Sequence, residues 1–437
     1  MKITIIGAGY VGLVVSVCFA NNGHKVICLE KNAERCRMLS DGNCPILEKD
    51  LPTMLQKAIK SNSISFTTRA AKAIPEAEVI FIAVGTPSDK IGNADLSALY
   101  TAISDIKKHA DVCRAVVIKS SVPPGTTDKV HNALLSTSGS SKFANNLQVV
   151  CNPEFLREGT AVNDFLMPDR LIIGTKNPEI AKLILSIYRP VLRNNPAEII
   201  TSPINAELIK YASNSYLAVR LSYINELAAL CEAIGGNINE VALGMGLDHR
   251  IGLEYLNAGL GYGGACLPKD TKALSHIAQD ADTPITVLES AIVANENVTS
   301  RIANRIANHL SPGCTVAILG VSFKAQTDDI RNSPVIFLME KVFSILKCKF
   351  QIYDPSFAEF SNNYPDKLLQ YMCDNSKEAI ETADALIIGA GWQEFKNESI
   401  YSVLPYMRGH IIFDFARVLD KTKVNTLGFD YFICGEK

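Results

Sequence analysis

The hydrophobic positions of this 437-residue chain follow two alternating patterns through its first half. Short runs rich in β-branched residues have the length of buried strands, and apolar residues at helical spacing follow them. The strand-like runs cover residues 1–6, 25–29, 78–84, 115–118 and 147–151. Buried strands that alternate with helices predict a mostly parallel sheet, and ligands bind such a sheet at the carboxyl ends of its strands.

The pattern changes in the middle of the chain and then returns. From about Ile204 to Ile234 the apolar spacing is helical with few breakers, which predicts one long helix that joins two domains. A second helical run covers residues 286–310, and a new strand-to-glycine transition begins at Cys314. We therefore expect an α/β protein with two Rossmann-like parallel-sheet domains joined by a long central helix. The expected domains are residues 1–202, 203–312 and 313–437, and the later strands are residues 350–354, 385–389 and 411–414.

The first strand-to-helix turn carries the pattern Gly7-x-Gly9-x-x-Gly12, with Tyr10 and Val11 inside it. The three glycines are expected to permit a tight turn, close approach of a pyrophosphate to a helix N-terminus, and close packing of helix on strand. The alternative is a structural turn that binds nothing. A strand on each side of the turn favours a dinucleotide site.

The second strand ends on Glu30, at the position of an acid that binds ribose hydroxyls. A carboxylate there favours NAD over NADP, because it repels a 2′-phosphate. Lys31 and Arg35 weaken that preference without reversing it. The predicted cofactor is therefore NAD.

Composition narrows the class of protein. Hydrophobic residues make up 47% of the chain and charged residues 20%, as in globular enzymes. The net charge of −2, without a Lys/Arg-rich run, argues against nucleic acid as a partner. No apolar run approaches the roughly 18 residues that span a bilayer, and no signal peptide is expected. The 12 cysteines are scattered without a CxxC pair or a metal-like cluster, so we expect reduced thiols, a cytoplasmic location and no metal site.

A second glycine-rich segment, residues 261–270, places Cys266 among glycines and close to Lys269 and Asp270. Glycines let a substrate approach the backbone closely, and a thiolate with nearby cations can attack a carbonyl carbon. The alternative is a buried structural cysteine after a turn. Asp270 is a candidate base, or it pairs with Lys269 or Lys272.

The long predicted helix carries Lys210 and Asn214 one turn apart, so both side chains emerge on one face. Such a pair can stabilise an oxyanion or orient a water. The alternative is a solvent-facing lysine and a surface asparagine. Glu154 and Glu158 have the spacing of one turn, and they either steer a water or cap a helix.

Together these segments resemble the nucleotide-sugar 6-dehydrogenases, most closely the UDP-glucose 6-dehydrogenases. The matching motifs run in family order along nearly the whole chain, up to Arg417. They are Gly7-x-Gly9-Tyr-Val-Gly12, Gly85-Thr86-Pro87, Lys119-Ser-Ser-Val-Pro-Pro-Gly125, Asn152-Pro-Glu-Phe-Leu-Arg-Glu-Gly159, Lys210-x-x-x-Asn214, residues 261–270 and Gly320-Val-Ser-Phe-Lys324.

The resemblance implies an NAD-dependent enzyme that oxidises C6 of UDP-glucose twice, giving UDP-glucuronate. It implies that Cys266 is the nucleophile, which forms a thiohemiacetal and then a thioester that water hydrolyses. It further implies that Lys210 and Asn214 stabilise the oxyanion, while Asp270 and Glu154 organise water and protons. By the same resemblance, the domains expected above bind NAD, join two subunits and bind the UDP moiety, in that order.

The resemblance also implies binding roles. The cofactor residues would be Gly7, Gly9, Tyr10, Val11, Gly12, Glu30, Arg35, Thr86, Ser121, Glu158, Lys269 and Arg331. The substrate residues would be Glu154, Phe155, Leu156, Lys210, Asn214, Arg250, Tyr255, Leu256, Asn257, Ala258, Gly259, Gly263, Lys324 and Arg417. Arg250 matches a residue that reaches the sugar nucleotide across a subunit interface, so a homodimer is implied.

Two positions depart from the family pattern. Ser121 stands where threonine is frequent, and Glu30 stands where aspartate is more usual. Neither change affects the expected reaction. GDP-mannose and UDP-N-acetylhexosamine dehydrogenases share the cysteine and glycine motifs, so these motifs do not decide the sugar and the base of the substrate. A third alternative is a protein with a degenerate site that senses a nucleotide without catalysis.

Overall fold

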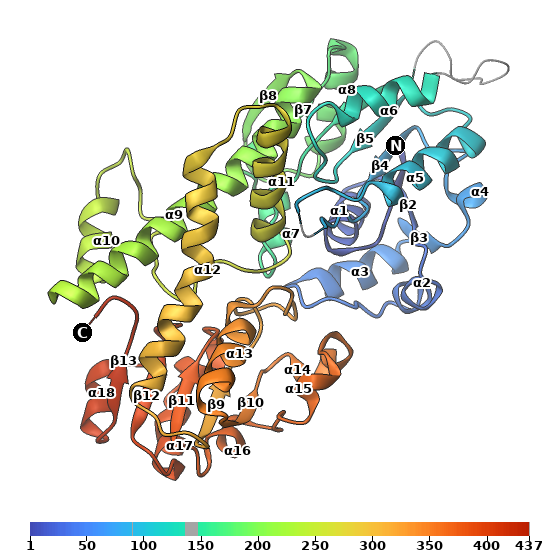
Figure 1. Cartoon of the computed structure of the whole chain (residues 1–437). Coiled ribbons are helices and arrows are strands. Elements are labelled where there is room, and N and C mark those ends of the chain that lie inside the picture. Colours follow the sequence, from blue (N-terminus) through green and yellow to red (C-terminus); the bar gives the residue numbers. More distant parts are fainter. Residues whose placement is uncertain (90, 136–146, 437) are drawn as a thin grey trace. The chain divides into compact units, whose positions relative to one another are not determined.

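The computed structural model describes residues 1–89, 91–135 and 147–436. The chain divides into two compact units, Met1–Ser213 and Asn214–Lys437. Helix α9 (Pro203–Ile234) runs without interruption through the boundary, as the long helical pattern predicted (Figure 1). Within the described ranges, no helix combines the length and apolar character needed to cross a bilayer.

The first unit contains an eight-stranded sheet in the order β3-β2-β1-β4-β5-β6-β7-β8. All its neighbouring strands are parallel except β6 and β7. The first six strands of that order form the dinucleotide-binding topology, with its switch point between β1 and β4. The strands are β1 (Lys2–Ile6), β2 (Lys25–Leu29), β3 (Ile64–Thr67), β4 (Val79–Ile82), β5 (Ala115–Ile118), β6 (Gln148–Cys151), β7 (Arg170–Gly174) and β8 (Ala197–Thr201).

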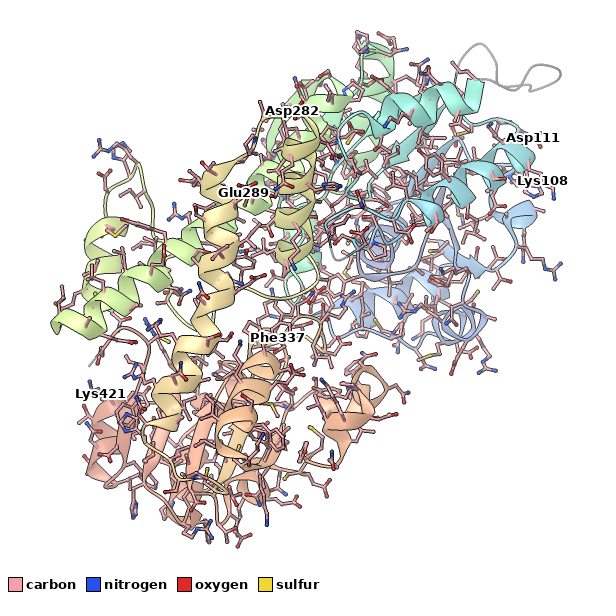
Figure 2. The ribbon with its side chains drawn as sticks, viewed as in Figure 1. Lys108, Asp111, Asp282, Glu289, Phe337 and Lys421 are labelled. Atoms are coloured by element: carbon pink, nitrogen blue, oxygen red, sulfur yellow. The ribbon has the colours of Figure 1, made fainter. Side chains whose placement is uncertain are left out.

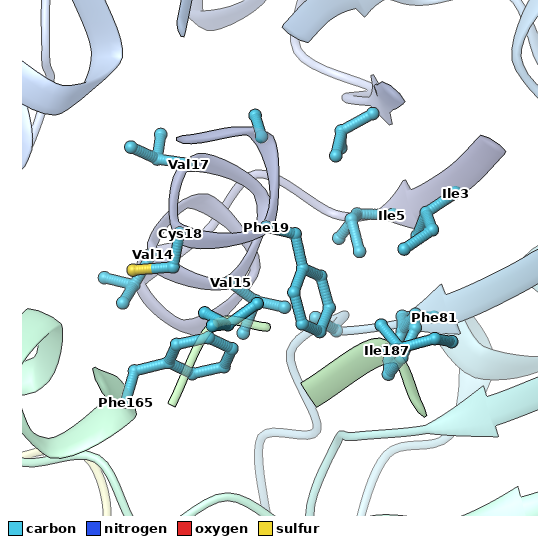
Figure 3. Packing of buried hydrophobic residues seen from close by; sticks show 14 of the residues in the cluster. Ile3, Ile5, Val14, Val15, Val17, Cys18, Phe19, Phe81, Phe165 and Ile187 are labelled. Atoms are coloured by element: carbon cyan, nitrogen blue, oxygen red, sulfur yellow. The ribbon is translucent and has the colours of Figure 1, made fainter. Parts of the chain in front are cut away.

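Helices cover both faces of this sheet, because alternate residues of each strand point to opposite sides. Ile3 and Phe81 pack with one set of helices, whereas Ile80 packs with the other set. Phe19 of α1 points from its helix toward Phe81 of the sheet (Figure 3). The helices are α1 (Tyr10–Asn21), α2 (Ala33–Ser40), α3 (Leu51–Lys60), α4 (Ala70–Ala73), α5 (Ser97–His109), α6 (Thr126–Leu135), α7 (Ala161–Leu166) and α8 (Pro178–Tyr188).

The second unit contains a five-stranded parallel sheet in the order β10-β9-β11-β12-β13. Its strands are β9 (Thr315–Leu319), β10 (Lys349–Tyr353), β11 (Ala385–Ile388), β12 (Ile411–Asp414) and β13 (Asp430–Phe432). Its helices are α10 (Ile238–Gly246), α11 (Leu267–Asp280), α12 (Thr286–Ala307), α13 (Pro334–Leu346), α14 (Phe357–Phe360), α15 (Asp366–Leu369), α16 (Ser376–Ile380), α17 (Ser399–Val403) and α18 (Lys421–Thr426). The predicted fold class, two Rossmann-like sheets joined by a long helix, is confirmed. The division at residues 202 and 312 stays a prediction.

Candidate active site

The turn after β1 contains three glycines, and two of them are required because a side chain there would clash with the protein's own backbone. Gly7 has φ +101°, and a Cβ there would lie 2.7 Å from the Ala83 carbonyl oxygen. A Cβ at Gly12 would lie 1.9 Å from the Gly7 carbonyl oxygen. These two glycines therefore allow the turn itself and the close packing of α1 on the sheet.

Gly9 differs from its two neighbours, because a Cβ there would meet nothing within 4 Å. It occupies the N-cap of α1, so space lies open before the unpaired N–H groups of the first helical turn. Tyr10 and Val11 form that turn and are half-buried. An open approach to a helix N-terminus suits the pyrophosphate of a dinucleotide.

Glu30 lies at the end of β2 and its carboxylate is buried. Oε2 accepts a hydrogen bond from the Ala8 N–H at 2.9 Å, and Oε1 accepts one from the Asn32 N–H at 2.8 Å. A carboxylate has about four acceptor positions, so each oxygen retains capacity for a ribose hydroxyl. Arg35 donates to the Ala8 carbonyl at 3.3 Å, which places it on the same turn. These residues fit NAD.

Thr86 and Ser121 follow the neighbouring strands β4 and β5. The Thr86 hydroxyl donates to the Ser121 carbonyl at 2.7 Å, so the two predicted cofactor residues lie together at this sheet edge. Thr86 is buried, whereas Ser121 is half-buried.

Glu48 is a buried residue that the sequence did not point to. Its carboxylate accepts hydrogen bonds from the Tyr10 hydroxyl and from the Gly159 N–H, the latter at 2.8 Å. Burial raises the pKa of Glu48, and the hydrogen bond from Tyr10 opposes that rise. Glu48 thus joins the glycine turn to the segment that carries Glu154 and Glu158.

Glu154 and Lys210 form a buried ion pair at 2.9 Å. Burial alone would raise the pKa of Glu154, but the charge and hydrogen bond of Lys210 outweigh it and hold that pKa below its usual range. The solvent-facing alternative for Lys210 is therefore wrong. The suggestion of a helix turn for Glu154 and Glu158 is also wrong, because residues 152–157 are irregular and Glu158 lies in a turn.

Lys119 is a second buried cation beside this pair. Its Nζ donates to Asn152 Oδ1 at 3.2 Å, and the same oxygen accepts the Tyr188 hydroxyl at 2.5 Å. Burial lowers the pKa of Lys119 to about 8, while Glu154 opposes the shift and Lys210 adds to it. The carboxyl edge of the first sheet thus holds two lysines near one carboxylate.

Three predicted residues lie along the segment that follows β6. The Phe155 ring has the Arg170 guanidinium 4.0 Å from its centroid and Lys210 Nζ at 5.3 Å. The Leu156 N–H donates to Glu154 Oε2 at 2.6 Å, which fixes the carboxylate against the backbone. Glu158 is half-buried.

In the second unit, Cys266 occupies the N-cap position of α11 and is exposed, whereas the other eleven cysteines are buried or half-buried. The buried-cysteine alternative is therefore wrong. The positive end of a helix favours negative charge, which suits a thiolate.

Asp270 lies one turn beyond Cys266 and is buried. One of its oxygens accepts from Asn214 Nδ2 and the other pairs with Lys269 Nζ, both at 2.5 Å. Asn214 is buried too, so the surface alternative for it is wrong. The structure therefore brings together Asn214, Lys269 and Asp270 near the N-terminus of the helix that Cys266 caps.

The predicted substrate segment 255–259 is irregular. Tyr255 has φ +61°, a left-handed conformation that is uncommon for an aromatic residue. The Gly259 N–H donates to Asn225 of α9 at 2.9 Å, and the Cys434 thiol approaches the Gly259 carbonyl at 3.6 Å. Leu256 and Ala258 are buried and Asn257 is exposed. Alternate positions of the segment therefore face the core.

The predicted cations of the second unit have separate surroundings. Arg417, at φ +55°, donates to Asn239 and to the Cys434 carbonyl, the latter at 3.0 Å. Lys324 Nζ lies 5.5 Å from the Phe323 ring centroid. Arg250 and Arg331 are exposed, and each forms an ion pair with an aspartate two residues earlier, Asp248 at 2.5 Å and Asp329 at 2.7 Å.

Arg220 of α9 is another residue that the sequence did not point to. It donates to three carbonyls of one loop, those of Ile251 at 2.8 Å, Gly252 at 2.9 Å and Glu254 at 2.7 Å. It therefore fixes the loop that carries Arg250. Packing requires glycine at position 263, because a Cβ there would lie 2.2 Å from the Asn332 carbonyl oxygen.

Three family models match the chain in order. The NAD binding domain of the UDP-glucose/GDP-mannose dehydrogenase family matches residues 1–192, the central domain of that family matches residues 204–297, and its UDP binding domain matches residues 317–421. The chain is also 38% identical to the UDP-glucose 6-dehydrogenase of Rickettsia felis, over 100% of this chain and 97% of that protein.

Solved structures agree with these matches. A UDP-glucose dehydrogenase from the archaeon Pyrobaculum islandicum has a TM-score of 0.86 at 30% identity, covering 100% of this chain and 98% of that one. A UDP-D-ManNAc dehydrogenase from Pyrococcus horikoshii has a TM-score of 0.85 at 26% identity, covering 100% and 99%. The chain therefore belongs to the UDP-glucose/GDP-mannose dehydrogenase family, and it is an NAD-dependent oxidoreductase that acts on a nucleotide sugar.

Proposed function

We propose that the chain oxidises C6 of UDP-glucose twice, producing UDP-glucuronate through a covalent bond to Cys266. The observation that carries this proposal is an exposed cysteine at the N-terminus of α11, one turn before a buried carboxylate held by Asn214 and Lys269. The alternative is the same chemistry on GDP-mannose or on a UDP-N-acetylhexosamine, because a structural relative at TM-score 0.85 is a UDP-D-ManNAc dehydrogenase.

NAD, held by Gly7, Gly9, Gly12 and Glu30, would supply the hydride acceptor. In the first oxidation C6 loses a hydride from its C–H bond and its hydroxyl loses a proton, which leaves an aldehyde. The Cys266 thiolate adds to that carbon and the carbonyl oxygen takes a proton, giving a thiohemiacetal. Loss of a second hydride and of the hydroxyl proton gives a thioester, and water then releases the acid and the thiolate.

The buried polar residues have distinct roles in this proposal. Lys210 stabilises negative charge on the C6 oxygen, and its contact with Glu154 fixes the position of the ammonium group. Asn214 and Lys269 hold Asp270 in place, and Asp270 with Glu154 orients the hydrolytic water and receives its proton. The remaining predicted residues hold the cofactor and the sugar nucleotide.

We further propose a homodimer. In the second unit α9 exposes Tyr216, Tyr223, Leu230 and Ile234, a stripe whose spacing places it on one side of the helix. The exposed Arg250 suits a residue that contacts the substrate of a second copy. The scattered cysteines, none in a CxxC pair, support a cytoplasmic location.

The substrate test is to incubate the purified protein with NAD and each sugar nucleotide in turn and to count the NADH formed per sugar consumed. Two NADH per UDP-glucose supports the proposal. Turnover only with GDP-mannose or a UDP-N-acetylhexosamine supports the alternative. No turnover with any of them contradicts both and favours a degenerate site that binds a nucleotide without catalysis.

A further inference from the structure

The side chain of Asn295 on α12 binds one residue of the glycine-rich segment that leads to Cys266. Its Oδ1 accepts the Tyr262 N–H at 2.8 Å, and its Nδ2 donates to the Tyr262 carbonyl at 3.1 Å. One amide thus satisfies both polar backbone groups of Tyr262. Residues 261–263 belong to no helix or strand, so their backbone groups need such partners.

Gly261 fits against the same amide. It has φ +91°, and a Cβ there would lie only 2.5 Å from Asn295 Oδ1. The backbone can therefore approach Asn295 only because position 261 carries no side chain. The glycine and the asparagine form one arrangement, although they come from different parts of the sequence.

Gly264 is enclosed in a similar way. A Cβ at Gly264 would lie 2.8 Å from the Phe323 ring, and Asn332 Nδ2 donates to the Gly264 carbonyl at 3.2 Å. The backbone is thus held at Tyr262 and again at Gly264, just before Cys266 at the N-cap of α11. Asn295 supplies two of these three side-chain hydrogen bonds.

We propose that Asn295 is a positioning residue that holds the Cys266 thiol where it captures the sugar aldehyde, and this inference rests on the proposed function. The first oxidation needs no thiol, whereas the second requires the thiohemiacetal. A loosened segment therefore lets aldehyde escape after one oxidation. The expected signature is a fall from two NADH per sugar toward one, which general destabilisation of the fold does not produce.

A cavity beside this contact provides a second test. Tyr262 and Asn295 line a cavity of about 560 Å³, together with Thr299 of α12 and Phe337 of α13. Phe337 is labelled in Figure 2, as is Glu289, which precedes Asn295 on α12. The cavity has room for a small amide such as acetamide. Acetamide carries the same donor and acceptor that truncation of Asn295 removes.

The experiment uses the full chain carrying Asn295→Ala, with NAD and UDP-glucose. We expect acid formation to fall about tenfold, NADH per sugar to approach one, and a carbonyl reagent to trap the released aldehyde. Added acetamide is expected to restore the ratio toward two, while the KM for NAD stays unchanged. Thr299→Ala is the matched control, because Thr299 lines the same cavity on the same helix, and its ratio is expected to stay at two.

A ratio of two in Asn295→Ala overturns the inference, whether or not the rate falls, because the aldehyde is then still captured. If that variant does not fold, Asn295→Asp decides the question in the same assay. This variant keeps the acceptor for the Tyr262 N–H but turns a carboxylate oxygen toward the Tyr262 carbonyl. Release of the aldehyde is therefore expected again, and a ratio of two NADH per sugar refutes the inference. A wild-type protein that makes no NADH refutes the proposed function instead.

Discussion

The two sheets of this protein begin alike and then diverge. In each, the first strand ends on a glycine with positive φ, Gly7 at +101° after β1 and Gly320 at +82° after β9. In each, an acid comes directly after the neighbouring strand, Glu30 after β2 and Asp354 after β10. Both acids are buried and both accept a backbone N–H from the turn beside them.

The two units differ in the segment that comes after each glycine. Helix α1 begins at Tyr10, directly after the turn, so its N-terminus stands beside the glycines. Helix α13 begins only at Pro334, and the intervening segment carries Lys324 instead of a second and third glycine. A helix N-terminus can serve a pyrophosphate in the first case, whereas a side-chain cation is presented in the second.

The two acids also differ in the number of hydrogen bonds that they accept from the protein. Asp354 accepts four hydrogen bonds, from the N–H groups of Val321, Ser322 and Ser356 and from the Ser356 hydroxyl. Glu30 accepts two and so retains lone pairs for a ligand. One topology therefore leaves acceptor capacity on the acid of the first unit and uses that of the second for structural hydrogen bonds.

The largest expected effect tests whether the nucleophile belongs to the second unit and the cofactor to the first. Cys266→Ala is expected to reduce acid formation by about a thousandfold or more, because no thioester can form. NAD binding, measured by fluorescence titration, is expected to be unchanged. Cys373→Ala, which alters a half-buried cysteine of the same unit, is the control. Normal acid formation by Cys266→Ala would remove the covalent step.

The next effect concerns the structural acid. Asp354→Ala is expected to lower the free energy of unfolding by about 3 kcal/mol, because it leaves buried donors of residues 321, 322 and 356 unpaired. The KM for NAD is expected to stay unchanged. Denaturant unfolding followed by circular dichroism measures the loss, and Asp354→Asn, which keeps one oxygen, is expected to lose less. An equal loss in both variants would contradict the account of four hydrogen bonds.

Local sequence was enough to predict much of this arrangement. The apolar runs that became β4 and β5 are buried on both faces, and such strands read as continuous hydrophobic segments. Strand β8 was not predicted, because it is an exposed edge strand with no such signal. The glycine turn and the Cys266 segment were predictable because each motif is contiguous in the sequence.

Partners distant in the sequence gave no such signal. Glu48 is separated by 38 residues from Tyr10, and Asn295 by 33 from Tyr262. Each lies in a stretch without a recognisable motif, and only the fold brings it to its partner. The burial of Lys210 was equally hidden, because an i, i+4 spacing fixes a face of the helix but not the elements that cover that face.

The acid with spare lone pairs provides the third prediction. Glu30→Ala is expected to raise the KM for NAD at least about tenfold, since the loss of one charged hydrogen-bond partner is worth about 1.5 to 3 kcal/mol. The KM for NADP is expected to change less, because the carboxylate disfavours the 2′-phosphate. Steady-state kinetics with both cofactors measures the two constants. An unchanged KM for NAD would place Glu30 with Asp354 as a purely structural acid.

The smallest effect compares how the two sheet edges respond to pH. Burial lowers the pKa of Lys119 in the first unit to about 8 and raises the pKa of Asp414 in the second. Between the lowered pKa of Lys119 and the ordinary lysine pKa, the unfolded chain holds a proton that folded Lys119 has lost, so the folded state gains stability as pH rises.

Wild type is therefore expected to gain about 1 kcal/mol relative to Lys119→Met between about pH 8.5 and pH 9.5, measured by urea unfolding. The titratable groups that act on Lys119 are Glu154, Lys210 and Cys151, and all three are retained in the variant. Asp414→Asn is the matched control, because it retains Lys119 and the groups around it, so the gain due to Lys119 cancels in the comparison with wild type. A constant difference for Lys119→Met as well would mean that this lysine keeps its proton, and the first sheet edge would then hold two permanent cations around Glu154.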